Sequence, residues 1–233
     1  MSARVAHMPR IRICFFSLLL TAALFTATGV ALPPAQSAPA TSQQRKTSEP
    51  YTGDLSIFDT PGREDRLQIN RVMDILSIAP KKSVADIGAG SGWFTVRAAK
   101  RTGETGVVYA VDINPEAIRY IDNRAQKDQL QNIKTILGKE DDPQLPADSV
   151  DAVLMLKTYH EIAQPVALLR KLHAALRKNA KVGIIDRNGN GEDHGIGRDV
   201  VIREAKQAGY RLQAQYDFVK ADKMDYFLVF TAD

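Results

Sequence analysis

The chain has 233 residues, of which 44% are hydrophobic and 25% charged, an ordinary composition for a globular protein. Its formal net charge is +4, but three of these charges, Arg4, Arg10 and Arg12, lie in the first forty residues, so the rest is nearly neutral. This balance gives no support for a nucleic-acid-binding surface. The only cysteine, Cys14, also lies there, which excludes a disulfide, a thiolate zinc site and a cysteine nucleophile from the rest of the chain.

The first forty residues have the pattern of a targeting segment. Basic residues precede an apolar run at 13–32, so we expect 1–40 to be a secretory signal peptide or an uncleaved membrane anchor. Residues 41–54 are rich in polar and small side chains and are predicted to form a flexible linker to a domain at 55–233. The basic start favours a cytoplasmic N-terminus with an exported body, periplasmic or secreted, and a cytoplasmic body is less favoured. Any membrane contact is expected through this segment alone.

From about residue 55 the hydrophobic period alternates between that of a helix and that of a strand. The predicted helices span 66–78, 93–102, a segment that begins at Asn114-Pro115, 164–176 and 199–208. The predicted strands span 83–87, 107–112, 133–137, 150–156, 182–185, 212–218 and 226–230.

These elements predict an α/β fold with a doubly wound, mostly parallel, seven-stranded sheet. Continuous apolar strands that alternate with amphipathic helices are typical of a parallel sheet covered on both faces. The last two strands are joined by a short polar loop, which predicts an antiparallel pair at the C-terminus. Sheets of this kind bind ligands outside the carboxyl ends of their strands.

The loop at 86–92, Asp-Ile-Gly-Ala-Gly-Ser-Gly, leaves the first strand and opens a helix. Its glycines, which permit tight turns and close approach of a ligand beside free helix N–H groups, are Gly88, Gly90 and Gly92. A tight turn without a ligand is the alternative, but it does not need three glycines. Dinucleotide enzymes use G-x-G-x-x-G, whereas Trp93 stands here in place of the third glycine. Asp86 would repel a pyrophosphate and attract an ammonium or sulfonium group, so a cationic cofactor is favoured.

With this loop the sequence resembles the class I S-adenosylmethionine-dependent methyltransferases over about 66–230. The resemblance implies a Rossmann-like methyltransferase fold in which Asp86 and the backbone of 88–92 hold the methionyl part of S-adenosylmethionine. It also implies that Asp112, at the end of the second strand, accepts hydrogen bonds from the ribose hydroxyls. The 20 residues from Gly92 to Asp112 suit ribose recognition as well. A solvated turn acid is the alternative interpretation of Asp112.

The loop after the third strand holds the candidates for contact with adenine. The resemblance implies an acid there against the adenine amino group, and Asp141 is favoured over its neighbour Glu140. An exposed acidic loop is the alternative for either residue. Asp151 fits the acid that opens the fourth strand in this family.

The end of the fourth strand is expected to supply catalytic groups. His160 is the candidate general base because its unperturbed pKa lies near neutrality. Tyr159 is expected to orient the acceptor or cover the cofactor, and Glu161 to orient His160 or cap the next helix. A partly buried histidine bonded to backbone is the alternative for His160. The absence of an Asn/Asp-Pro-Pro-Tyr/Phe motif separates the chain from the amino-group methylases of adenine or glutamine, and the lack of a body cysteine excludes the covalent cytosine C5 route.

No metal is predicted. The polar, glycine-rich stretch at 188–195 lacks the calcium-loop pattern, and the spacing of His160, Asp186 and His194 matches no known metal site. We interpret the stretch as a loop. Arg63 and its neighbour Glu64 either point into the cleft or form a solvated helix start.

The sequence therefore predicts a methyltransferase that uses S-adenosylmethionine and acts on a small or medium-sized acceptor, with no nucleic-acid partner. A non-catalytic binder of S-adenosylmethionine or a nucleoside is the alternative, and a nicotinamide-dependent oxidoreductase is disfavoured by the loop. An exported body conflicts with a cofactor that is made inside cells, and an anchor, a supply of cofactor across the membrane or a loss of activity would each resolve that conflict.

Overall fold

The computed structural model describes residues 45, 47, 51–191, 193–220 and 222–233. The predicted leader at 1–40, with Cys14, lies outside the described residues, as does most of the predicted linker. All described residues belong to one compact unit that spans 41–233. None of the helices that they form has the length and apolarity needed to span a bilayer.

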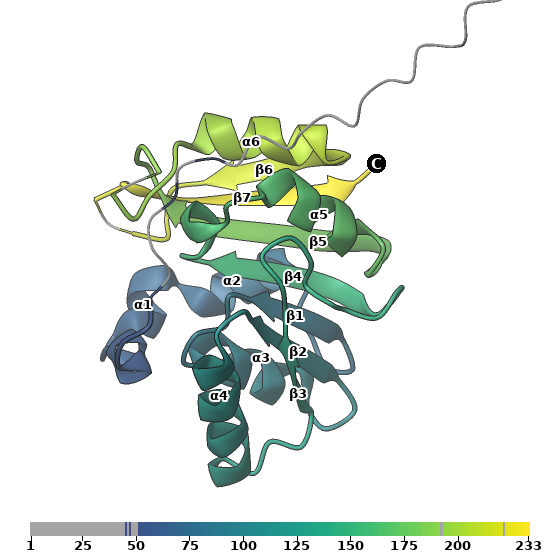
Figure 1. The fold of residues 1–233 in the computed structure, drawn as a ribbon. Coiled ribbons are helices and arrows are strands. Elements are labelled where there is room, and N and C mark those ends of the chain that lie inside the picture. Colours follow the sequence, from purple (N-terminus) through teal and green to yellow (C-terminus); the bar gives the residue numbers. More distant parts are fainter. Residues whose placement is uncertain (1–44, 46, 48–50, 192, 221) are drawn as a thin grey trace, which may run out of the picture. The chain divides into compact units, whose positions relative to one another are not determined.

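A seven-stranded sheet in the order β3-β2-β1-β4-β5-β7-β6 forms the centre of this unit (Figure 1). The strands are β1 (Ser83–Ile87), β2 (Val107–Asp112), β3 (Ile133–Leu137), β4 (Val150–Leu156), β5 (Leu176–Arg187), β6 (Tyr210–Tyr216) and β7 (Asp225–Ala232). The first five strands pair in parallel, and β7 lies antiparallel between β5 and β6. The predicted α/β fold with a C-terminal antiparallel pair is confirmed.

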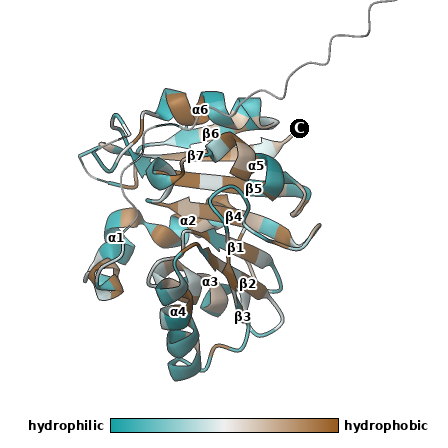
Figure 2. Cartoon of the chain, viewed as in Figure 1, coloured by the Kyte–Doolittle hydropathy of each residue, from teal (hydrophilic) through white to brown (hydrophobic). Residues whose placement is uncertain are grey.

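Helices cover both faces of the sheet, as the unbroken apolar strands require. They are α1 (Arg63–Leu67), α2 (Ile69–Ile75), α3 (Trp93–Thr102), α4 (Pro115–Lys127), α5 (Pro165–His173) and α6 (Arg198–Gln207), with short 3-10 turns η1 (Leu55–Asp59) and η2 (Tyr159–Glu161). Buried side chains of α5 and α6 pack on one face of the sheet, and those of α2 and α3 pack on the other. Figure 2 shows the result, with apolar residues concentrated in the central strands and polar residues on α4. All five residues of β1 are buried.

Two predicted helices differ from the structure. The predicted helix at 66–78 is two short helices, α1 and α2, because Gln68 between them has a left-handed backbone with φ of 47°. The apolar positions Ile69, Val72 and Met73 still face the core. The predicted helix at 164–176 ends at His173, and the following strand starts six residues earlier than predicted, at Leu176.

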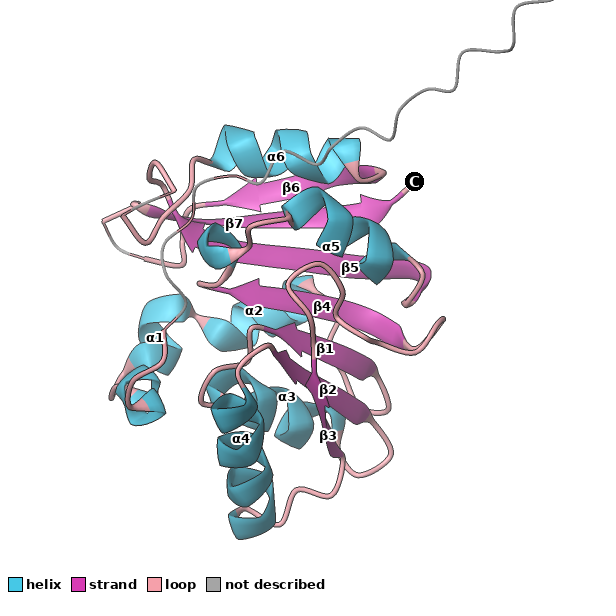
Figure 3. Ribbon diagram, in the orientation of Figure 1, coloured by secondary structure: helices cyan, strands magenta, loops and turns pink. Residues whose placement is uncertain are grey.

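Parallel pairing gathers the functional segments at one edge of the sheet. β1 pairs in parallel with both β2 and β4, and their arrowheads point to the same side in Figure 3. The loop at 88–92, Asp112 and the turn η2 therefore follow neighbouring strands at the same edge. Asp186, near the end of β5, joins them because β5 pairs in parallel with β4.

Candidate active site

The glycine loop is packed directly against the segment that follows β4. Gly88, Gly90 and Gly92 have φ values of 72°, 54° and 70°. At Gly88 a side chain is excluded for a second reason, because an added Cβ would lie 2.6 Å from the Cβ of Thr158. Because glycine has no side chain, the loop can pack against Thr158, which directly precedes the turn η2.

Backbone hydrogen bonds hold the loop over the end of β2. The amides of Gly88 and Ala89 donate to the carbonyl of Val111 at 2.8 and 3.1 Å. The carboxylate of Asp112 accepts from the amide of Gly90 at 2.8 Å and from that of Asn114 at 2.9 Å. These two amides bond to different oxygens of the carboxylate, which retains acceptor capacity for a ligand hydroxyl. Burial raises the pKa of Asp112. This geometry fits the predicted ribose contact.

Asp86 lies beneath the loop and is 2% exposed. One of its oxygens accepts a hydrogen bond of 2.6 Å from the hydroxyl of Thr95 in α3. Burial raises the pKa of Asp86 to about 7, against the opposing effects of Thr95 and the more distant charge of Arg63. A cation bound at the loop would favour the ionised form of this carboxyl, which agrees with the predicted preference for a cationic cofactor.

Trp93 begins α3 at the position of the third glycine of a dinucleotide loop. Its ring is buried, and the guanidinium carbons of Arg63 and Arg97 lie 4.5 and 3.9 Å from the ring centroid. Arg63 thus packs on the aromatic ring, while Glu64 accepts from Arg97 at 3.1 Å. These residues line an open pocket of about 350 Å³ beside α1.

A second group of contacts, which the sequence did not predict, joins η1 to the loop. One nitrogen of Arg124 donates to both oxygens of Asp59, at 2.9 and 3.0 Å, and to the carbonyl of Ser91 at 3.0 Å. The hydroxyl of Ser91 donates to Asp59 at 3.1 Å. The partners come from segments 32 to 65 residues apart, so no local pattern in the sequence signals them.

The loop that holds the predicted adenine-contacting acids starts beside Asp112. The amide of Gly138 donates to the carbonyl of Asp112 at 2.9 Å, which places the start of their loop beside the end of β2. Glu140 is exposed and Asp141 is half-buried, and a backbone bridge between Lys139 and Asp142 closes the turn around them. Contact of either acid with adenine stays a prediction.

Tyr159 lies in the core and points toward α6. It is fully buried, its hydroxyl donates to Glu204 at 2.9 Å, and the guanidinium of Arg45 lies 5.0 Å from its ring centroid. Arg45 also pairs with Glu204 at 2.7 Å. Burial raises the pKa of Tyr159 well above its usual value. This environment favours a packing role over the predicted contact with acceptor or cofactor.

His160 is held by a buried carboxylate. It is 4% exposed, and its Nδ1 lies 2.9 and 3.1 Å from the two oxygens of Asp186, which is fully buried. The backbone amide of His160 also donates to Asp186, at 3.0 Å. A carboxylate at Nδ1 favours the tautomer with its proton on that nitrogen, which leaves the lone pair on Nε2. The ring of His160 is thus bonded to a carboxylate and not to backbone, and its Nε2 is suited to accept a proton or to bind a metal ion.

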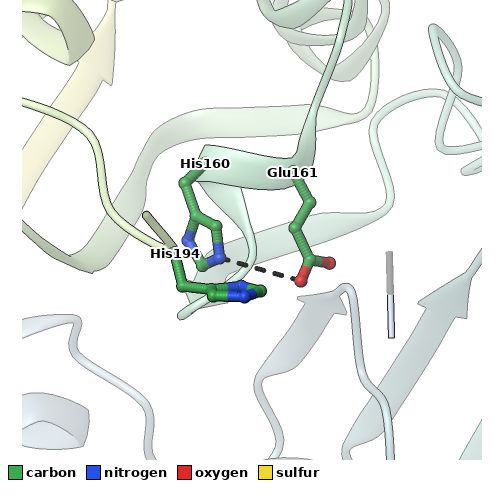
Figure 4. Close-up of side chains that lie close together, drawn as sticks. All are labelled: His160, Glu161 and His194. Atoms are coloured by element: carbon green, nitrogen blue, oxygen red, sulfur yellow. Dashed lines mark ion pairs between the residues drawn. The ribbon is translucent and has the colours of Figure 1, made fainter. Parts of the chain in front are cut away.

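The outer nitrogen of His160 faces two other groups. Its Nε2 lies 3.7 Å from an oxygen of Glu161, and the ring of His194 meets the ring of His160 edge-on at a centroid distance of 5.8 Å (Figure 4). Burial raises the pKa of Glu161 to about 7, although His160 lowers it. His194 comes from the predicted loop after β5, whose ends are joined by a hydrogen bond from Ile196 to Arg187 at 2.8 Å.

Comparison with known proteins identifies the family. Residues 78–213, more than half of the chain, match a family model described as a methyltransferase domain. The chain belongs to the class I S-adenosylmethionine-dependent methyltransferases. The family and its fold imply S-adenosylmethionine as the cofactor, as the loop predicted.

Two curated relatives are similar in sequence to part of this chain. Nocamycin O-methyltransferase of Saccharothrix syringae is 28% identical over 129 residues, which are 55% of this chain and 46% of the relative. The 2-phytyl-1,4-naphtoquinone methyltransferase of a Nostoc species is 31% identical over 108 residues, 46% of this chain and 47% of the relative. The chain thus matches about half the length of these relatives.

The fold is shared with a structure described as a SAM-dependent methyltransferase from Aquifex aeolicus. The two chains are 24% identical, with a TM-score of 0.71, over 78% of this chain and 100% of the other. The likeness concerns the fold.

Proposed function

We propose that the chain is a methyltransferase that transfers the methyl group of S-adenosylmethionine to a small-molecule acceptor. One observation carries this proposal, the direct packing of the glycine loop at Gly88 on Thr158, two residues before His160. It places the cofactor loop and a histidine held by Asp186 at adjoining positions on the edge of the sheet. A methyl donor and a group able to accept a proton are what methylation of a hydroxyl requires.

The residues of the loop have separate tasks in this proposal. The amides of 88–92 and the carboxylate of Asp86 bind the methionyl part of the cofactor, and Asp112 binds the ribose. S-adenosylmethionine supplies the methyl group on a positively charged sulfur. His160, oriented by Asp186, accepts the proton of the acceptor through Nε2.

Charge and the named relatives support a small acceptor. The chain outside the leader has 28 basic and 27 acidic residues, so it lacks the net positive charge that would attract nucleic acid. The relatives described above carry the names of a nocamycin and a phytyl-naphthoquinone methyltransferase.

An exported or membrane-anchored location is also part of the proposal. It is supported by the basic start and the apolar run at 13–32. Fractionation of tagged full-length protein, with a check for cleavage near residues 31–40, tests it. Recovery of the uncleaved chain in the cytoplasmic fraction would contradict it.

Calorimetry on the full-length chain with S-adenosylmethionine, S-adenosylhomocysteine and NAD tests the cofactor. We expect the first two to bind and NAD not to bind, and the reverse result would overturn the proposal. Transfer of a labelled methyl group to a small-molecule fraction, compared with transfer to tRNA, then tests the acceptor. Cofactor binding without transfer to either would instead favour the non-catalytic binder.

A further inference from the structure

The side chains of His160, Glu161 and His194 converge at one point, and together they have no role in the proposed cofactor site. One nitrogen of His160, one of His194 and one oxygen of Glu161 all lie within 4.8 Å of one another. In Figure 4 the side chains of His160 and Glu161 leave the same short turn, and His194 approaches from a separate segment. Nε2 of His160 and the oxygen of Glu161 are 3.7 Å apart, close to the separation of two ligands on one ion, so only small side-chain adjustments would complete a site.

The described part of the chain also supplies the outer partner that such a site needs. Histidines that bind metals donate their other ring nitrogen to a carboxylate or carbonyl, which fixes the tautomer and the orientation of the ring. Asp186 does this for His160, at 2.9 Å from Nδ1. Asp186 itself is held by the amides of His160 and Arg187, at 3.0 and 2.8 Å. The Nε2 lone pair of His160 is therefore aimed at Glu161 and His194 before any ion arrives.

The chemistry of the three groups selects the class of ion. Two imidazoles and one carboxylate form a set typical of zinc and of non-haem iron(II), with coordination positions left open. Calcium and magnesium prefer oxygen ligands alone, so they fit this set poorly. A divalent ion also balances the two negative charges that Glu161 and Asp186 carry when ionised.

The point of convergence adjoins the cofactor loop. Thr158, two residues before His160, touches Gly88 of that loop. An ion at this point would thus lie beside the methyl donor, where an acceptor has to bind.

We propose that His160, Glu161 and His194 bind one divalent transition-metal ion, with zinc as the representative, and leave a position open for an oxygen of the acceptor. The bound ion lowers the pKa of an acceptor hydroxyl, whose proton passes to solvent water. In this state Nε2 of His160 is a metal ligand, and the ion takes over the task assigned above to the imidazole alone. The role in acceptor activation rests on the proposed function, whereas metal binding itself does not.

Titration of the metal-stripped full-length chain with Zn²⁺, in competition with a chromogenic chelator, tests the site. We expect one equivalent to bind and the affinity to fall at least about tenfold in His194→Ala. His173→Ala is the matched control, because it removes an imidazole on α5 whose ring lies 5.7 Å from Tyr210, away from the site. Binding that is absent in the parent chain, or equally strong in His194→Ala, would overturn the proposal.

Binding of S-adenosylhomocysteine, measured on the same samples, separates this proposal from the proposed function. His194 is exposed on a loop, so His194→Ala is expected to keep the fold and the cofactor affinity. Co²⁺ provides a second readout, because its visible absorption bands report nitrogen and oxygen ligation, and we expect the bands in His173→Ala and not in His194→Ala. Cofactor binding without metal binding would reject the metal site alone, and metal binding without cofactor binding would reject the proposed function alone.

Discussion

Gly88 and Thr158 are in direct contact, and this contact joins the cofactor loop to the turn that carries His160. A Cβ at Gly88 would lie 2.6 Å from the Cβ of Thr158, and the φ of Gly88 is 72°. Both the space and the backbone therefore exclude a side chain.

Gly88→Ala is expected to weaken the binding of S-adenosylhomocysteine and to lower the free energy of unfolding, because the loop must move away from Thr158. Gly209→Ala is the control, since Gly209 has a φ of 88° but no atom within 4 Å of an added Cβ. The control should lose only the backbone contribution of about 1–2 kcal/mol and keep its cofactor affinity. Calorimetry and urea unfolding measure both effects, and equal affinities in the two variants would contradict the role of the contact.

Asp112→Asn is expected to reduce the affinity for S-adenosylhomocysteine about ten- to a hundredfold, because a hydrogen bond to a charged acceptor contributes about 1.5–3 kcal/mol. The amide oxygen can still accept from Gly90, but the NH2 group then meets the N–H of Asn114, so urea unfolding of the same variant separates lost affinity from lost stability. Asp122→Asn, which alters an exposed acid on α4 that accepts from Thr135, is the control. Unchanged affinity in Asp112→Asn would argue for the solvated turn acid instead.

The stability of the cofactor-free protein should fall with pH because of Asp86. Its pKa is raised to about 7 in the folded chain from an ordinary value of 3.8, so the folded state holds this proton more tightly than the unfolded state. The contribution to stability is therefore fully present below pH 3.8 and is lost as the pH rises to about 7. Urea unfolding of the parent chain and Asp86→Asn across this range measures the difference, and parallel curves would contradict the assignment.

His160→Ala is expected to lower turnover by about a hundredfold or more, the range typical for loss of an acid–base group, while cofactor affinity stays unchanged. Asp186→Asn should lower turnover as well, because it removes the carboxylate that sets the tautomer of His160. Methyl-transfer assays beside calorimetry provide the comparison. Full turnover in His160→Ala would leave this histidine with a purely structural role.

Most of the strands were predictable from the sequence because burial of both faces leaves a strong local pattern. β1, β2, β3 and β4 have the predicted bounds, and β1, β2 and β4 are mostly apolar runs, whereas β3 at the edge of the sheet also carries Lys134 and Thr135. β5 extends beyond its prediction because Arg177, Lys178 and Asn179 at its start are polar, although the strand continues through them. The break between α1 and α2 at Gln68 leaves the helical period intact, so periodicity alone did not reveal it.

In the candidate site, too, some features were predictable from the sequence and others were not. Asp86, the three glycines and Asp112 were predictable because the chain places them within one strand–loop–helix–strand unit, where spacing determines position. Tyr159 and His160 were predicted together as neighbours in sequence, yet one turns toward Glu204 in the core and the other toward Asp186. The direction of each side chain depends on packing, which spacing does not reveal.

By itself the sequence determined the fold class, the family and the class of cofactor, because these depend on periodicity and on one contiguous loop. The tertiary structure decided which distant residues meet. It brought Arg124 to Asp59, and His194 to His160 and Glu161, across gaps of tens of residues. For the two histidines the physical reason is that parallel pairing of β4 with β5, strands remote in sequence, brings the segments after their carboxyl ends together at one edge.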